Sequence, residues 1–148
     1  MHVEATIEID RPLQEVFGYV CDVGNYPKWM AHVLAVHKDT SGPPQESDRF
    51  VVVIKSVGRR FETPYQRTAY IADQRCTDQA VGGPIPNQRW HSTFHEVPRG
   101  TRVSRAVDVE ATGLLKLLEP LQRRAAGRQL ERDLQTLKGA LENRPSVN

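Results

Sequence analysis

Apolar and polar residues alternate over Val3–Ile9, which predicts a half-buried β-strand at the start of the chain. Residues 12–22 carry apolar side chains at helical spacing instead, and Asp10 is the expected helix N-cap. A second, very short helix is expected over Asn25–Met30, after a break at Gly24. The chain is therefore predicted to open with one strand and two short helices.

Further strands separated by short turns are expected after these helices. The segments with apolar or alternating character are 33–38, 50–57, 61–72, 75–81, 88–97 and 101–111. Short turns between successive strands favour an antiparallel sheet, and a sheet of about seven strands has to curve.

One long helix is expected at the C-terminal end, where Pro120 either kinks the helix or marks its start. Apolar residues recur along it every three to five positions: Leu114, Leu118, Leu121, Ala125, Leu130, Leu134, Leu137 and Leu141. A single apolar stripe needs a surface to cover. The predicted architecture is an α+β domain over residues 1–148, in which the curved sheet grips the long helix and leaves a space between them.

Composition narrows the class of protein. The 148 residues carry 20 Lys and Arg against 18 Asp and Glu, an excess too small to indicate nucleic-acid binding. The chain contains no stretch near the ~20 apolar residues of a membrane span, and its N-terminal residues lack the features of a secretory signal. Cys21 and Cys76 form no CxxC motif and no disulfide framework, so we expect a cytoplasmic protein without stable membrane insertion.

Arg105 conflicts with the pattern around it. In segment 101–111 the alternation places Arg105 on the apolar face, together with Val103, Val107 and Val109. Burial of an unpaired guanidinium is costly, so Arg105 must meet a carboxylate, a ligand or water in a cavity. It would suit a carboxylate, an enolate or a polarised carbonyl of a ligand. Alternatively, it reaches a cavity mouth or pairs with a carboxylate of the sheet: Glu62, Asp108 or Glu110.

The same alternation predicts other cavity-lining residues. Strand 88–97 should turn Trp90, Ser92 and Phe94 inward. In segment 61–72 the inward set comprises Phe61, Thr63, Tyr65, Arg67, Ala69 and Ile71, although Tyr70 favours the opposite register.

Three positions on helices or next to them complete the candidates. Trp29 could form a wall of the site, and His32 could line its entrance as a general base. Gly127 would leave room for a ligand beneath the long helix. Core packing explains Trp29 equally well, and a tolerated glycine on a solvated face explains Gly127. The candidate ligand-binding residues are therefore Trp29, Tyr65, Arg67, Trp90, Ser92, Phe94, Arg105, Val107 and Gly127, and the catalytic candidates are Arg105, Tyr65 and His32.

No metal or cofactor is expected. His91 and His95 lie four residues apart on a predicted strand, hence roughly 13 Å from each other, and cannot share one zinc ion. The chain has neither GxGxxG nor a GK[ST] phosphate-binding loop.

Residues 3–30, the stretch Gly100-Thr101-Arg102-Val103, and the segment from Gly113 to Glu142 are similar to the START/Bet v 1-like superfamily, and most of all to its polyketide cyclase/dehydrase-like branch. The resemblance implies the helix-grip fold, an antiparallel sheet wrapped around a long C-terminal helix and enclosing a cavity. The superfamily includes lipid carriers, hormone receptors, polyketide aromatases and chaperone cofactors. No set of residues in this chain matches the catalytic pattern of the dedicated aromatase/cyclases.

Three functions are compatible with these observations. The first is binding of a small apolar or amphipathic molecule, of polyketide, lipid, sterol or quinone type, between the sheet and the helix. The second is a cofactor-independent polyketide cyclase/dehydratase, in which pocket Arg, Tyr and His residues stabilise an enolate and move protons. The third is a regulatory or partner-binding module without a small ligand. The sequence leaves open whether the protein is an enzyme and whether it is a monomer or a homodimer.

Overall fold

A computed structural model describes residues 1–39, 41–85, 87–110 and 116–144. The elements follow the chain in this order: β1 (His2–Ile9), α1 (Leu13–Val20), a 3₁₀ turn (Val23–Asn25), α2 (Tyr26–Trp29), β2 (Val33–Lys38), β3 (Arg49–Ser56), β4 (Arg59–Ile71), β5 (Arg75–Ala80), β6 (Arg89–Val97), β7 (Gly100–Asp108) and α3 (Glu119–Glu142). The predicted strands and helices are all present, with ends shifted by a few residues.

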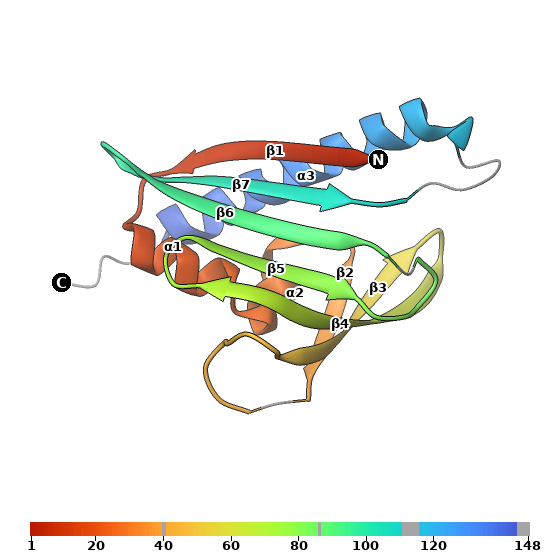
Figure 1. Cartoon of the computed structure of the whole chain (residues 1–148). Coiled ribbons are helices and arrows are strands. Elements are labelled where there is room, and N and C mark those ends of the chain that lie inside the picture. The colour runs from red at the N-terminus through yellow and green to blue at the C-terminus, as the bar shows by residue number, and fades with distance from the viewer. Residues whose placement is uncertain (40, 86, 111–115, 145–148) are drawn as a thin grey trace.

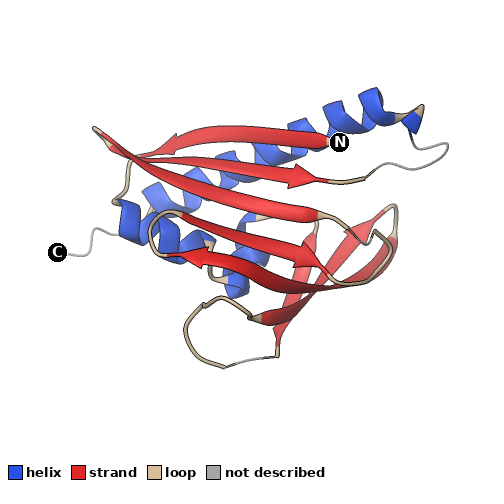
Figure 2. Ribbon diagram, in the orientation of Figure 1, coloured by secondary structure: helices blue, strands red, loops and turns tan. Residues whose placement is uncertain are grey.

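The strands form one seven-stranded sheet in the order β1-β7-β6-β5-β4-β3-β2, and every neighbouring pair is antiparallel. Each strand pairs with its successor except at the closing step, where β1 pairs with β7. The sheet curves around the helices, all of which lie on one of its faces (Figures 1 and 2). α3 packs along β1 and against α2. The predicted helix-grip architecture is confirmed.

The start of α1 differs from the prediction. Pro12, not Asp10, occupies the N-cap position, in an extended conformation with ψ of 146°. The Pro12 carbonyl accepts the first helical hydrogen bond, from the Val16 amide at 3.1 Å. The Asp10 amide instead donates to Glu142 at the far end of α3, 2.9 Å away.

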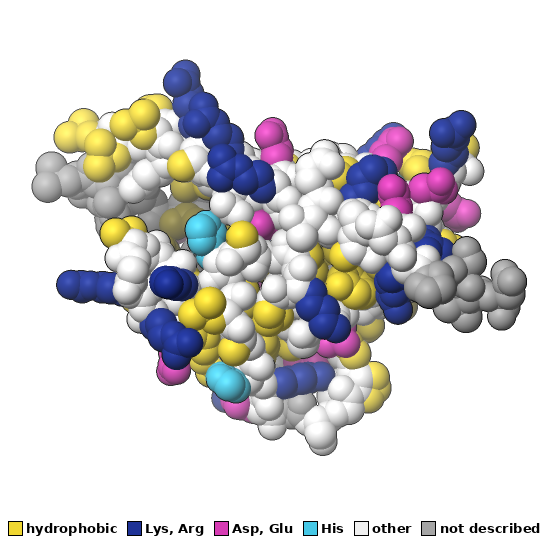
Figure 3. Space-filling model, turned by 180° about the vertical axis from the view of Figure 1, so that it is seen from behind, with side chains coloured by type: hydrophobic (Ala, Val, Ile, Leu, Met, Phe, Trp, Pro, Cys, Tyr) yellow, Lys and Arg dark blue, Asp and Glu magenta, His cyan; other side chains and the backbone are white. Residues whose placement is uncertain are grey.

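The apolar stripe of the long helix is covered over only half of its length. Pro120 lies in the first turn of α3 and marks its start. Leu130, Leu134, Leu137 and Leu141 are buried, whereas Leu118 and Leu121 are 50% and 66% exposed; Leu114 lies outside the described residues. The 24 residues of α3 extend about 36 Å, and the 8 residues of β1 only about 26 Å. The first turns of α3 therefore project beyond the sheet, and their apolar side chains appear at the upper left of Figure 3.

The register of β4 changes along the strand. Thr63, Tyr65 and Arg67 are buried as predicted, but a β-bulge lies between Arg67 and Ala69. Because a bulge adds one unpaired residue, the faces exchange beyond it. Tyr70 therefore turns inward and packs against Phe17, and the inward placement predicted for Ala69 and Ile71 is wrong.

The prediction that the two cysteines remain unpaired is also wrong. Cys21, at the end of α1, and Cys76, on β5, form a disulfide with their Cα atoms 6.5 Å apart. They are separated by 55 residues in the sequence, and only the packing of α1 against the sheet brings them together. The expectation of a reducing compartment rested on unpaired cysteines and loses that support. Among the described helices, none combines the length and apolar character that a membrane crossing needs.

Candidate functional site

A cavity of about 220 Å³ lies on the inner face of the sheet, beside α2 and α3. Strands β2 to β7 contribute to its wall, and most of the wall is apolar or aromatic. Its lining residues are Tyr26, Met30, His32, Val33, Phe50, Val52, Ile54, Tyr65, Asp78, Ile85, Gln88, Trp90, Arg105 and Asp133.

The alternation along the four adjacent strands β4 to β7 brings two arginines onto this inner face. Trp90 on β6 lies between Asp78 on β5 and Val107 on β7, and Ser92 lies opposite Arg105. Arg67 on β4 lies opposite Asp78. The two guanidinium groups are almost completely buried, at 1% and 4% exposure for Arg67 and Arg105.

Arg67 is held in a complete network of polar partners. Its Nε donates to Asp78 Oδ1 at 2.9 Å, and its Nη1 donates to the carbonyl of Cys21 at 2.7 Å. Its Nη2 lies 3.4 Å from the Tyr26 hydroxyl and 3.5 Å from Asp78 Oδ2. Burial alone would lower the pKa of Arg67, but the interactions with Tyr26 and Asp78 outweigh it and raise that pKa above its usual value. Arg67 therefore stabilises the fold by fixing α1 and α2 to the sheet.

Tyr26 and Asp78 complete this network. The Tyr26 hydroxyl donates to Asp78 Oδ2 at 2.7 Å. Burial, and then the Asp78 carboxylate, raise the pKa of Tyr26, so its proton stays in this hydrogen bond at neutral pH. Both oxygens of Asp78 are thereby occupied, although Asp78 belongs to the cavity wall.

Arg105 has far fewer partners. Its Nη1 donates to Ser92 Oγ at 2.8 Å, and its Nη2 makes a weak contact of 3.8 Å with the sulfur of Met30. Three aromatic rings surround its Cζ, those of Trp90, Trp29 and Tyr26, with centroids at 4.8, 5.1 and 5.7 Å. Among the described residues, no carboxylate forms an ion pair with it.

The structure decides between the alternatives for Arg105. Glu62 and Glu110 are exposed. Asp108 lies on the outer face of the sheet, where His2 Nδ1 and His91 Nε2 lie 2.5 and 3.1 Å from its two oxygens. Pairing with these carboxylates is therefore wrong, and Arg105 lines the cavity.

Tyr65 also lines the cavity and stacks on Phe50, with ring centroids 5.7 Å apart. Burial raises the pKa of its hydroxyl to about 12, although the positive charge of Arg105 opposes the shift. The Tyr65 hydroxyl therefore keeps its proton at neutral pH and can donate it in a hydrogen bond.

The exposed lining residues mark the mouth of the cavity. His32, just after α2, and Ile85, in the turn before β6, are exposed. On the α3 side, Gln129 Oε1 lies 3.1 Å from His32 Nε2, and Gln129 Nε2 donates to Asp133 Oδ1 at 2.8 Å. The first covered turns of α3 and the chain around His32 thus form one rim.

The structure brings together some of the predicted site residues and separates others. Tyr65, Trp90, Arg105 and His32 line the cavity. Ser92 and Trp29 touch Arg105 from outside the lining, and Phe94 packs with Phe17 in the core. Val107 packs with Val3 and Leu130. Gly127 lies near β1, where an added Cβ would be 3.8 Å from Val3, and Arg67 belongs to the buried network.

Sequence reasoning did not identify several lining residues. Phe50, Val52 and Ile54 alternate along β3, a signal that the continuous apolar run over 50–54 obscures. Asp78 and Met30 carried no pattern that points to the cavity.

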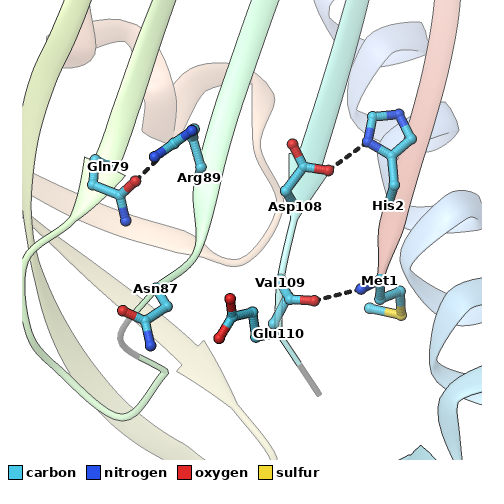
Figure 4. Close-up of a pocket in the computed structure, with 8 residues that line it drawn as sticks. All are labelled: Met1, His2, Gln79, Asn87, Arg89, Asp108, Val109 and Glu110. Carbon is cyan, nitrogen blue, oxygen red and sulfur yellow. Dashed lines mark hydrogen bonds and ion pairs between the residues drawn. The ribbon is translucent and has the colours of Figure 1, made fainter. Parts of the chain in front are cut away.

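A larger pocket of about 480 Å³ lies on the outer face of the sheet, around the start of β1 and the end of β7 (Figure 4). Four of its six polar side chains already bond one another: Arg89 donates to Gln79 Oε1 at 2.8 Å, and His2 bonds Asp108. Because most of its polar side chains are thus satisfied within the protein, we take the inner cavity as the candidate site. Within the described ranges no group of His, Cys, Asp and Glu side chains is arranged to hold a metal ion.

Comparisons with known proteins agree with this architecture. Residues 1–142 match the family described as "Polyketide cyclase / dehydrase and lipid transport". No curated protein matches the sequence.

Three solved structures illustrate the shared fold. The protein TTHA0849 from Thermus thermophilus has a TM-score of 0.79 at 17% identity, covering 94% of this chain and 95% of that one. A START superfamily protein from Mycobacterium smegmatis has a TM-score of 0.78 at 16% identity, with 95% and 97% covered. The Zhui aromatase/cyclase from Streptomyces sp. R1128 has a TM-score of 0.77 at 15% identity, with 97% and 94% covered. The resemblance drawn from the sequence is confirmed.

Proposed function

Because the chain belongs to the family of polyketide cyclases/dehydrases and lipid-transport proteins, we propose that its inner cavity binds a small apolar or amphipathic molecule. The observation that carries the proposal is an unfilled cavity with a largely aromatic and aliphatic wall on the inner face of the sheet. Pockets of this character bind ligands by removing apolar surface from water, at roughly 25 cal/mol per Å².

The size of the cavity limits the ligand. At about 30 Å³ for each water-sized group, 220 Å³ holds roughly seven non-hydrogen atoms. A ligand of about ten or eleven such atoms would extend through the mouth between His32, Ile85 and Asp133. A module that binds only protein partners would not need this empty space, so the cavity favours a small ligand over that alternative.

The test uses a matched pair of cavity variants. Val52 lines the cavity, whereas its neighbour Val51 does not; because successive strand residues face opposite sides, Val52→Phe should fill the cavity and Val51→Phe should leave it open. The freshly purified proteins are compared by native mass spectrometry for retained small molecules. They are then titrated with a neutral aromatic such as naphthalene while the fluorescence of Trp90 and Trp29 is recorded.

We expect the wild type and Val51→Phe to bind and Val52→Phe to lose binding. Absence of a retained molecule and of naphthalene binding in the wild type would refute the proposed function. Equal binding by Val52→Phe would place the ligand elsewhere.

A cofactor-independent cyclase or dehydratase remains the second candidate, because Arg105, Tyr65 and His32 line one cavity. There Arg105 and the protonated Tyr65 would donate hydrogen bonds to a developing enolate, and His32 at the mouth would exchange protons with solvent. Turnover of a short poly-β-ketone thioester should then fall in Arg105→Gln and Tyr65→Phe while both proteins stay folded. Unchanged turnover in both variants would exclude these roles.

A further inference from the structure

Arg105 carries a positive charge that the protein itself leaves without a counterion among the described residues. Of its five N–H groups, one is bonded to Ser92 Oγ at 2.8 Å, and a second makes the weak contact with Met30. The Cζ atom lies over three aromatic rings, which attract the positive charge but supply no anion and no carboxylate or carbonyl acceptor for the N–H groups. Since the side chain is 4% exposed, bulk water does not replace the missing partners.

Arg67 shows what this fold does with an arginine that serves structure alone. On the same inner face, it has a carboxylate, a carbonyl and a hydroxyl within 3.5 Å. An isolated buried charge is strongly unfavourable, and the usual solution is a paired and hydrogen-bonded arrangement like this one. Arg105 has no such set of partners among the described residues, and it borders the cavity.

The carboxylates around the cavity do not supply the missing charge. Asp78 is occupied by Arg67 and Tyr26. Asp133 lies at the rim, where it accepts hydrogen bonds from the Ala31 amide at 3.2 Å and from Gln129. Among the described lining residues, the guanidinium of Arg105 is therefore the one cationic group without an anionic partner.

We propose that the ligand of this cavity is a small monocarboxylic acid with an apolar body, whose carboxylate is bound by Arg105. The inference rests on the proposed function and names its ligand class. A guanidinium has the planar fork of donors that binds a carboxylate through two parallel hydrogen bonds. The apolar body lies against Phe50, Val52 and Tyr65. Ser92 fixes the guanidinium from behind and remains a positioning residue.

The experiment compares 3-phenylpropanoate with 3-phenylpropanamide, which share size and shape and differ in the charge of the head group. Binding to the full chain is measured by isothermal titration calorimetry near pH 7. Because hydrogen bonds between charged groups contribute more than neutral ones, the acid should bind about 10- to 100-fold tighter than the amide. In Arg105→Gln this preference should disappear while the amide still binds.

Two controls keep the result interpretable. Arg105→Lys retains the charge without the fork and should retain part of the preference. Thermal melting reports whether each variant is folded, and the comparison of acid and amide on the wild type tests the proposal without any variant.

Equal affinities for acid and amide, or a preference that survives in Arg105→Gln, would overturn the carboxylic-acid ligand and leave the proposed function standing. If neither the acid nor the amide binds while naphthalene still binds, the carboxylic-acid ligand is overturned as well. Failure of all three probes, with no small molecule retained by the purified protein, would refute the proposed function itself.

Discussion

The two buried arginines provide a comparison of charge with and without a partner, on one face of one sheet. Replacing each with methionine removes the charge and keeps a long apolar side chain. Arg67→Met leaves Asp78, whose side chain is 5% exposed, with the Tyr26 hydroxyl as its remaining hydrogen-bond partner in this network. Arg105→Met removes a group that has no ion-pair partner among the described residues.

The expected changes in the free energy of unfolding differ by several kcal/mol. Breaking a buried ion pair by removing one partner destabilises by ~3–5 kcal/mol, so Arg67→Met should lose about that much. Arg105→Met loses a charge-assisted hydrogen bond of ~1.5–3 kcal/mol and ring contacts of ~2 kcal/mol. It also removes a desolvation penalty of several kcal/mol. These contributions nearly cancel, and we expect a change within about 1 kcal/mol or a net stabilisation.

Thermal and urea unfolding followed by circular dichroism measure both changes. At ~2–4 °C per kcal/mol for a chain of this size, the melting temperature of Arg67→Met should fall by roughly 6–20 °C. That of Arg105→Met should move by no more than about 4 °C.

Equal losses in both variants would refute the reasoning. Arg105 would then be a structural residue like Arg67, and its missing counterion would say nothing about a ligand. A small loss of unfolding free energy in Arg67→Met would instead show that water replaces Arg67 as a partner of the buried network.

Three further outcomes are expected. Val57 is 98% exposed and has a φ of 51° in the β3–β4 turn, so Val57→Asn should stabilise the protein by about 1 kcal/mol in urea unfolding; a loss would refute the assigned turn geometry. Leu137 is fully buried, and Leu121 lies on the projecting turns of α3. Leu137→Ala should therefore cost ~2–5 kcal/mol and Leu121→Ala at most about 0.5 kcal/mol in the same assay, and similar losses would contradict the projecting helix. The Cys21–Cys76 disulfide closes 55 residues, so its reduction should lower stability by about 4 kcal/mol. An intact mass equal to that of the reduced chain would show that the bond is absent.

The sequence predicted the elements well because the strands and helices carry strong periodic patterns. Alternation alone placed Arg105 on the inner face of β7, since each residue of a regular strand faces opposite to the one before it. The same rule failed in β4 beyond Arg67, where the bulge inserts one residue and the sequence contains only the competing signal of Tyr70.

Partners distant along the chain could not be predicted in this way. Cys21 and Cys76 are 55 residues apart, and Tyr26 meets Asp78, 52 residues further along the chain, only because α2 packs onto the sheet. Local patterns hold no information on which of several buried polar groups will share a hydrogen bond. In the sequence Arg67 and Arg105 therefore look alike, and only the tertiary packing shows that Arg67 has a carboxylate partner.

The sequence by itself determined the order of the elements, the antiparallel meander and the inward direction of Arg105, because hydrophobic periodicity and turn residues act over a few neighbouring positions. Only the tertiary structure decided that Arg67 has a counterion and that Arg105 has none among the described residues, that the cysteines pair, and that half of the stripe on α3 stays uncovered. These features depend on distances between segments that the sheet and the helices bring together, and such distances are set by packing of the whole chain.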